Sequence, residues 1–138
     1  MKVQYFDLKN KRAVISGGAS GIGSSIVEHP CEQGVEVYFF DINKIEAKKT
    51  LKRIKSKNFK IPTFIECDVK NIKRYKSLIL NIIKTKGPID ILINNASNDQ
   101  RHNLEQITEK YWDERMTINL KHYLFAIQSV KKLSLIHI

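Results

Sequence analysis

The sequence is poor in the residues that build metal sites, disulfide frameworks and membrane spans. Its 138 residues include two cysteines, Cys31 and Cys67, whose separation matches neither a metal knuckle nor a disulfide framework. No two of its four histidines have the spacing of zinc ligands on one helix face. No apolar run approaches the roughly 18 residues of a membrane helix, and the amino-terminal segment lacks the apolar core of a secretory signal. We therefore expect no metal, no membrane association and a cytoplasmic location.

Acidic residues are also scarce, with 14 against 24 basic ones, which gives a formal net charge of +10. Much of the excess lies in residues 44–60, where a single acid, Glu46, accompanies a run of lysines. Such a run suits either a phosphate-tracking surface or the solvent-facing side of a helix. Because aromatic residues do not alternate with the lysines as in nucleic-acid modules, we favour the solvated helix and expect no nucleic-acid partner.

Strand-like and helix-like segments alternate along the chain. Buried-strand patterns cover 12–16, 35–41, 61–69 and, after a turn, the end of 87–96, whereas helix patterns cover 22–34, the basic stretch up to Lys57, 72–86 and 107–130. This alternation predicts an α/β fold, a Rossmann-type doubly wound parallel sheet. We expect the strand order third, second, first, fourth, with the sheet truncated after about four strands and the fourth strand an exposed edge. Pro30 predicts a kink in the first helix, or marks a sequence error.

A glycine-rich stretch, SGGASGIG, follows the first strand and opens the first helix. In that context Gly17 suits a tight turn, Gly21 lets main-chain amides approach a pyrophosphate, and Gly23 lets the helix pack on the strand. The positive end of the helix dipole also favours phosphates. Asp41 closes the second strand, where its carboxylate can accept both ribose hydroxyls and repel a 2′-phosphate. The pattern predicts NAD as the cofactor, with NADP less favoured but kept open by Lys44; a flexible turn without a ligand is the alternative.

The spacing G-x-x-x-G-x-G resembles the signature of the short-chain dehydrogenase/reductase family. Three further motifs of that family follow in order, namely CDV at 67–69, NNA at 94–96 and Asn119 within the long helix. The resemblance implies that Asp68 contacts the adenine, that 94–96 lines the cofactor ribose, and that Asn119 belongs to the catalytic tetrad. The expected cofactor-binding residues are Ser16, Gly17, Ser20, Gly21, Ile22, Gly23, Asp41, Asp68, Val69, Asn94, Asn95 and Ala96.

Asn119 also falls on an apolar stripe of its helix, so we expect a buried amide that either serves a site or bonds the main chain. The stripe consists of Trp112, Met116, Leu120, Tyr123 and Ile127. The other tetrad members, a serine and a tyrosine followed four residues later by a lysine, are not recognised. Tyr111 precedes Asn119 and is followed at that distance by Arg115, and Tyr123 is followed by Ile127. We therefore expect an amino-terminal fragment that is inactive on its own.

The loop after the fourth strand is dense in hydrogen-bond donors and acceptors, at the edge where this fold presents groups to a substrate. Its candidate substrate contacts are Asn98, Asp99, Arg101 and His102, with Gln100 among them. The loop suits a polyhydroxylated substrate, and the region resembles bacterial aldose 1-dehydrogenases, especially D-xylose dehydrogenases, which oxidise the anomeric carbon to a lactone. The expected function is an NAD-dependent sugar dehydrogenase, a homo-oligomer at full length. A polar surface loop, a 3-oxoacyl-carrier-protein reductase-like enzyme and a non-catalytic nucleotide-binding module remain alternatives.

The last six residues, 133–138, match the translation of a sequencing-library adapter. We interpret them as a read-through artefact and assign residues 1–132 to the amino-terminal part of an NAD(P)-binding Rossmann domain. The alternative is an ordinary apolar helix end or strand start.

Overall fold

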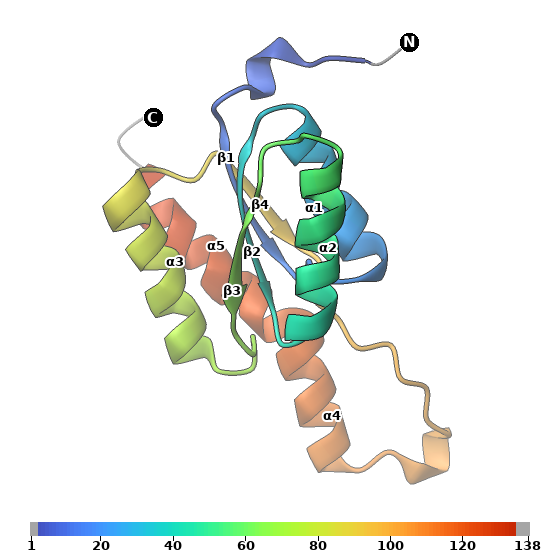
Figure 1. Ribbon diagram of the computed structural model, residues 1–138. Coiled ribbons are helices and arrows are strands. Elements are labelled where there is room, and N and C mark those ends of the chain that lie inside the picture. The colour runs from blue at the N-terminus through green and yellow to red at the C-terminus, as the bar shows by residue number, and fades with distance from the viewer. Residues whose placement is uncertain (1–2, 135–138) are drawn as a thin grey trace.

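A four-stranded parallel sheet forms the centre of the computed structural model, which describes residues 3–134 (Figure 1). Its strands are β1 (Arg12–Ser16), β2 (Glu36–Asp41), β3 (Thr63–Glu66) and β4 (Ile91–Asn94). The strand order is β3-β2-β1-β4, and Val14 of β1 lies opposite Tyr38 of β2 and Leu92 of β4. The predicted α/β fold and strand order are confirmed, with β4 at one edge of the sheet.

Helices cover both faces of this sheet. They are α1 (Gly21–Glu32), α2 (Lys44–Ser56), α3 (Ile72–Lys86), α4 (Glu109–Met116) and α5 (His122–Ser134), with 3-10 turns at Phe6–Leu8 and Leu104–Gln106 and a π-helical turn at Thr117–Lys121. Figure 1 shows α1 and α2 on one face, α3 and α5 on the other, and α4 extending beyond the sheet. Within the described residues no helix combines the length and apolarity that a membrane span requires.

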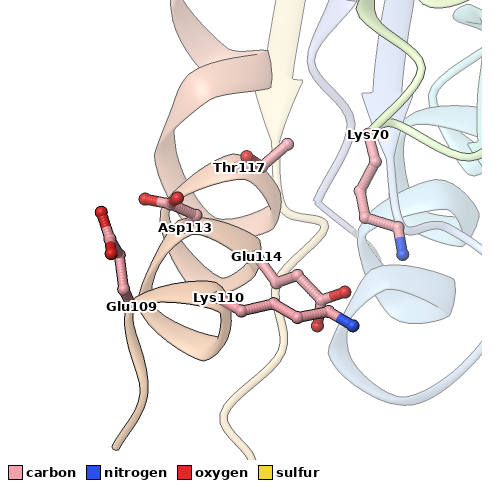
Figure 2. Close-up of a pocket in the computed structure, with 6 residues that line it drawn as sticks. All are labelled: Lys70, Glu109, Lys110, Asp113, Glu114 and Thr117. Carbon is pink, nitrogen blue, oxygen red and sulfur yellow. The ribbon is translucent and has the colours of Figure 1, made fainter.

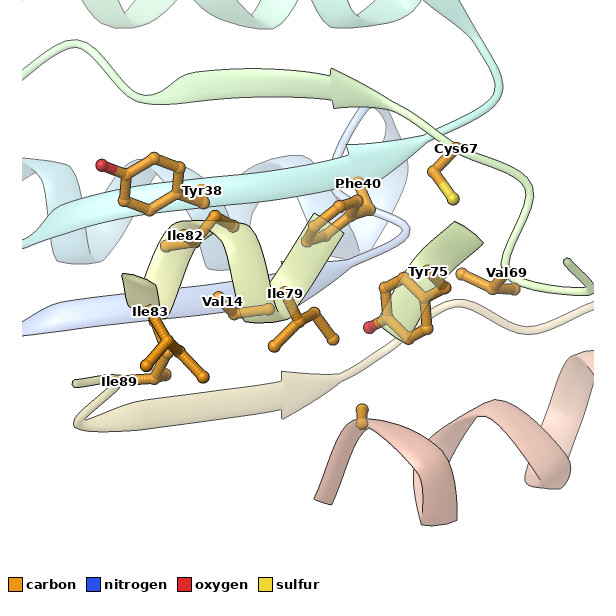
Figure 3. Packing of buried hydrophobic residues seen from close by; sticks show 11 residues of the cluster. Val14, Tyr38, Phe40, Cys67, Val69, Tyr75, Ile79, Ile82, Ile83 and Ile89 are labelled. Atoms are coloured by element: carbon orange, nitrogen blue, oxygen red, sulfur yellow. The ribbon is translucent and has the colours of Figure 1, made fainter. Parts of the chain in front are cut away.

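The central strand β1 is buried from both sides, as a parallel strand between two helical layers must be. Ala13, Val14 and Ile15 have no exposed surface. Because side chains alternate along a strand, Val14 joins the cluster under α3 and α5, whereas its two neighbours join the cluster under α1 and α2. Figure 3 shows the first cluster, in which Tyr75 and Ile79 of α3 pack on the sheet. The apolar run of β1 therefore identifies the middle of the fold.

The basic stretch folds as the predicted solvated helix. Asn43 caps α2 by accepting the Glu46 N–H at 3.1 Å, and the helix turns Ala47, Thr50 and Ile54 inward. Its lysines are exposed, which places the positive charge on the outer side of the helix.

The long helix predicted over 107–130 is present, but it begins at Glu109 and is not α-helical throughout. After α4 the chain makes a π-helical turn, which contains one residue more per turn than an α-helix and so rotates the faces of everything that follows. Among the side chains of α5 that are described, up to residue 131, those of His122, Ala126 and Ser129 are buried. The expected stripe is largely exposed, and Trp112 retains 58% of its surface. An imidazole and two small side chains, not the large apolar residues of the expected stripe, are thus buried on α5.

Pro30 lies inside α1 and does not end it, since the helix continues to Glu32. The kink and the sequence error considered for this position stay predictions. Proline cannot donate to the carbonyl of Ile26 four residues earlier, but the loss falls in the last turn, where few helical bonds remain.

At the other end of the chain, residues 135–138 lie outside the described residues. The interpretation of 133–138 as an artefact therefore stays a prediction.

Candidate functional site

A pocket of about 780 Å³ opens at the carboxyl ends of the strands, the edge at which open α/β sheets hold their ligands. Its lining residues are Gly17, Ser20, Gly21, Ile22, Gly23, Phe40, Asp41, Ile42, Asn43, Cys67, Asp68, Val69, Lys70, Asn95, Ala96, Ser97, Asn98, Asp99 and Ile118. The glycine-rich loop, the acid of β2 and the CDV and NNA motifs, which lie far apart in the sequence, thus meet around one space.

Three glycines shape the floor of this pocket, each in a different way. Gly17 has a φ of 70°, and a Cβ on it would lie 2.7 Å from the Cα of Ala96. A Cβ on Gly23 would lie 1.8 Å from the Gly17 carbonyl oxygen, so this glycine packs on the loop itself and not on a strand as expected. Gly21 has a φ of 53° and faces open space. The main chain at Gly21 is therefore the part that a ligand can approach closely.

The residue that packs α1 onto the sheet is a fourth glycine, Gly18, whose role was not predicted from the sequence. A Cβ at Gly18 would lie 2.7 Å from Val27 of α1 and 2.8 Å from Phe39 of β2. The two adjacent glycines in SGGASGIG could have indicated this role, because the turn needs only Gly17 and leaves Gly18 to be explained.

The first turn of α1 is open to an anion. Ser20 is the N-cap, yet its side chain makes no capping hydrogen bond, and no acidic residue lies in the first turn. The amide N–H groups of a first helical turn have no partner within the helix. No acidic side chain in that turn therefore neutralises the positive end of the α1 helix dipole, which faces the pocket.

Asp41 stands at the rim, where β2 ends. Its two carboxylate oxygens accept the N–H groups of Ala19 and Asn43, each at 2.9 Å. Each oxygen still has accepting capacity after one such bond, because a carboxylate offers about four acceptor positions. Lys44, the cation that the sequence suggested for a 2′-phosphate, forms an ion pair with Glu66 at 2.9 Å.

Ser16 lies beneath the pocket and does not line it. Its side chain is fully buried, and its oxygen accepts the N–H groups of Asn95 at 3.0 Å and Ala96 at 3.1 Å. The Asn95 amide in turn donates to the Gly17 carbonyl at 2.9 Å. Asn94, opposite Ser16 in the β1–β4 register, is also outside the lining. These residues hold the NNA turn against the glycine loop.

Asn119 lies in the π-helical turn and is half-buried. Its Oδ1 accepts the Asn98 N–H at 2.8 Å, and its Nδ2 donates to the Asn98 carbonyl at 3.1 Å. Of the two roles expected for this amide, the structure displays the bond to main chain. Asn119 thereby fixes the start of the loop that follows β4.

The four candidate substrate residues separate into two pairs. Asn98 and Asp99 line the pocket, whereas Arg101 and His102 do not. The ring of His102 stacks on Tyr111 of α4 at 4.0 Å, and the Tyr111 hydroxyl donates to the Gln100 carbonyl at 2.7 Å. The loop is thus folded onto α4 after Asp99, which carries its second half away from the pocket.

A second hollow, of about 550 Å³, lies between α4 and the loop before α3 (Figure 2). Its lining is Lys70, Glu109, Lys110, Asp113, Glu114 and Thr117. Charges of both signs surround it, and only Lys70 is shared with the main pocket. No group of three potential metal ligands occurs among the described residues, here or elsewhere.

Some lining residues were not anticipated from the sequence. Ile42 and Asn43 follow Asp41 directly, and that adjacency was the usable signal. Cys67 precedes Asp68 in the CDV motif, and burial raises the pKa of its thiol, so it remains protonated at neutral pH and is no nucleophile. Ile118 has no local signal, because only the π-helical turn directs it to the pocket.

One tyrosine does have a lysine four residues later, namely Tyr5 with Lys9. Both precede β1 and lie near its amino end, where the Tyr5 N–H donates to Gln33 at 2.9 Å. The pocket lies at the opposite ends of the strands, so this pair is not part of it.

A parallel sheet of this order, with a glycine loop after β1 and an acid after β2, defines a Rossmann-type nucleotide-binding domain. The chain belongs to the short chain dehydrogenase family, whose model matches residues 11–135. It is 40% identical over 126 residues to a D-xylose 1-dehydrogenase of Caulobacter vibrioides, covering 91% of this chain and 49% of that protein. A probable galactose dehydrogenase of Rhizobium meliloti is 33% identical, with 92% and 50% covered.

Solved structures agree with this assignment. A putative short-chain alcohol dehydrogenase from Sinorhizobium meliloti superposes with a TM-score of 0.82 at 26% identity, over 93% of this chain and 50% of that one. The ligand-free aldohexose dehydrogenase of Thermoplasma acidophilum gives 0.78 at 28% identity, over 94% and 46%. The chain thus spans about half the length of the relatives it matches.

Proposed function

We propose that this chain is the dinucleotide-binding part of an NAD-dependent aldose dehydrogenase that oxidises the anomeric carbon to a lactone. The observation that carries the proposal is the position of Asp41 in the pocket, where it bonds Ala19 beside the open first turn of α1. A carboxylate there accepts the hydroxyls of an unmodified ribose and repels a 2′-phosphate. The pairing of Lys44 with Glu66 competes with a 2′-phosphate for this cation, as a surface ion pair of modest strength.

The residues present fit a dinucleotide. The open space over Gly21 and the uncapped turn at Ser20 would take the pyrophosphate, since backbone amides can approach it there without a Cβ in the way. Asp41 would take the adenosine ribose. Asp68 and Val69, at the neighbouring edge of the same pocket, would take the adenine. A dinucleotide held in this way would supply the acceptor for the hydride that leaves the substrate.

The chain's own groups position the reacting parts and leave proton removal to another residue. Asn119 cannot act as a base, because a carboxamide has no useful proton affinity near neutral pH and both its polar atoms bond the main chain of Asn98. Its proposed contribution is to hold Asn98 and Asp99 at the pocket. No tyrosine after Asn119 has a lysine four residues later in this sequence, so we propose that the general base lies outside these 138 residues.

The choice of a sugar rests on the loop and on the relatives. Asn98 and Asp99 offer an amide and a carboxylate to the pocket, a combination suited to several hydroxyl groups. His102, stacked on Tyr111 of α4, and Arg101, outside the pocket lining, are withdrawn from the proposed substrate contacts. Two of the relatives named above act on D-xylose and galactose by their descriptions.

Asp41→Asn tests the cofactor assignment better than Asp41→Ala, because an amide oxygen preserves one of the two bonds to main-chain N–H groups. We expect about tenfold weaker NAD binding and unchanged or tighter NADP binding, measured by titration calorimetry. Asp90→Asn is the matched control, since Asp90 also accepts a main-chain N–H, from Arg12, but at the far end of the sheet. Equal losses for both cofactors in Asp41→Asn would contradict the assignment.

Substrate class is tested by NADH formation in the full-length protein with a panel of aldoses. Turnover of a pentose or hexose with NAD is expected. Turnover confined to NADPH and a 3-oxoacyl thioester would instead support the reductase alternative, and dinucleotide binding without any turnover would support the non-catalytic module.

A further inference from the structure

One buried polar side chain below the pocket has no part in the function proposed so far. His122, the first residue of α5, has no exposed surface. Its Nε2 lies 3.3 Å from the Ser16 oxygen. Its Nδ1 is buried without a hydrogen bond of good geometry, beside the main-chain carbonyls of Thr117 and Ile118 in the π-helical turn. A fully buried imidazole is costly unless its nitrogens have defined roles.

The partners of Ser16 determine which nitrogen carries the proton. A hydroxyl oxygen has two lone pairs and one proton. Both lone pairs are engaged, because the oxygen accepts the N–H groups of Asn95 and Ala96. Two groups could receive the hydroxyl proton, namely Nε2 of His122 at 3.3 Å and the buried Tyr75 hydroxyl, which also lies beside Ser16. Only Nε2 meets Ser16 with hydrogen-bond geometry, because the Tyr75 hydroxyl has no such partner. Nε2 therefore accepts the proton and is itself unprotonated. The ring proton then lies on Nδ1, facing the carbonyls of the π-helical turn.

The surroundings of the ring favour the neutral form. Two phenol rings pack edge-on against it, Tyr75 of α3 at 5.9 Å and Tyr123 of its own helix at 4.4 Å. Figure 3 shows Tyr75 between the sheet and α5. Burial lowers the pKa of His122, with the two main-chain carbonyls acting in the opposite direction. Burial also raises the pKa of Tyr75, so that phenol stays protonated.

We propose that neutral, Nδ1-protonated His122 is a positioning residue that links the turn carrying Asn119 to the ends of β1 and β4 through the Ser16 hydroxyl. At one end of the link, Ser16 fixes Asn95 and Ala96, whose N–H groups it accepts. At the other end, His122 fixes the π-helical turn, from which Asn119 holds Asn98. The cofactor side and the substrate side of the pocket are thereby held by one buried contact.

The hydrogen bond from Ser16 is lost when the side chain at position 122 cannot accept a proton. A leucine at 122 fills comparable space but leaves the Ser16 hydroxyl proton unpaired in a buried site, which is the costly case for a hydrogen bond. A glutamine places its amide oxygen as many bonds from Cβ as Nε2 is in histidine, so it can accept the same proton. The pair therefore separates the hydrogen bond from simple space filling.

The expected change in NAD binding rests on the proposed function, whereas the protonation of His122 at Nδ1 does not. In the full chain labelled with ¹⁵N-histidine, we expect NMR of His122 to report a neutral ring protonated at Nδ1 at pH 7. His122→Leu should weaken NAD binding about tenfold, and His122→Gln should stay within about twofold of wild type. His29→Gln, at an exposed histidine of α1, is the matched control and should change nothing.

A ring protonated at Nε2, or equal binding losses in the leucine and glutamine variants, would overturn the positioning role. If the leucine variant does not fold, the ring tautomer and the glutamine variant decide. If wild-type protein binds no dinucleotide, the proposed function fails, and the link is then judged by the tautomer and by the Asn95 and Ala96 amide shifts, which must move in the leucine variant only.

Discussion

Replacing Gly23 with alanine is predicted to destabilise the protein more than any glycine-to-alanine change whose Cβ meets open space. The new Cβ would lie 1.8 Å from the Gly17 carbonyl oxygen and 2.7 Å from the Asn95 amide nitrogen, whereas ordinary contact begins at 3.4 Å. The first of these atoms is main chain and cannot swing aside. Relief requires the glycine loop to move away from α1, and we expect a cost of about 3 kcal/mol.

The assay is thermal unfolding followed by circular dichroism, in which about 3 kcal/mol corresponds to a melting temperature lower by roughly 10 °C for a domain of this size. Gly21→Ala is the matched control, since its Cβ would meet nothing within 4 Å and it bears only the strain of a φ of 53°. That strain costs about 1 kcal/mol. A Gly23→Ala protein that melts no lower than Gly21→Ala would refute the close packing of the loop on which the site depends.

Three further predictions follow from the charges and the site. Glu66→Gln releases Lys44 from its 2.9 Å ion pair and should tighten NADP binding about threefold, measured by titration calorimetry. Because burial holds the pKa of His122 below its ordinary value, the unfolded chain binds more protons there, and stability to urea should fall as the pH drops below about 6.5. His122→Gln should remove that dependence. The chain as written should form no NADH with any aldose, because its amide at Asn119 cannot remove the hydroxyl proton; aldose-dependent NADH formation would contradict this.

The sheet could be predicted because its central strands are buried on both faces and so appear as short apolar runs between turn residues. The predicted third strand is longer than the observed one. Residues 61–69 have one continuous pattern, but β3 ends at Glu66, and Cys67, Asp68 and Val69 then leave the ladder to line the pocket. A functional motif and a strand end can share one apolar pattern, which periodicity alone does not separate.

Most of the pocket lining was also predictable, because the carboxyl ends of parallel strands meet at one edge of the sheet. Motifs that follow β1, β2 and β4 therefore come together whatever their distance in sequence. The polar pairs beneath the pocket were not predictable. Ser16 and His122 are separated by 106 residues, and no local pattern records such a partner. The π-helical turn was missed for a similar reason, since its register depends on what α5 packs against.

The central claim is that the glycine loop and the rim at Asp41 hold NAD. The most direct measurement is a titration of the ¹⁵N-labelled protein with NAD, followed by amide chemical shifts. The account predicts saturable shifts at Gly17, Gly21, Asp41 and Asp68, with weaker changes on addition of NADP at the same concentrations. Absence of saturable shifts at these amides, or shifts confined to the second hollow at Lys110 and Glu114, would contradict it.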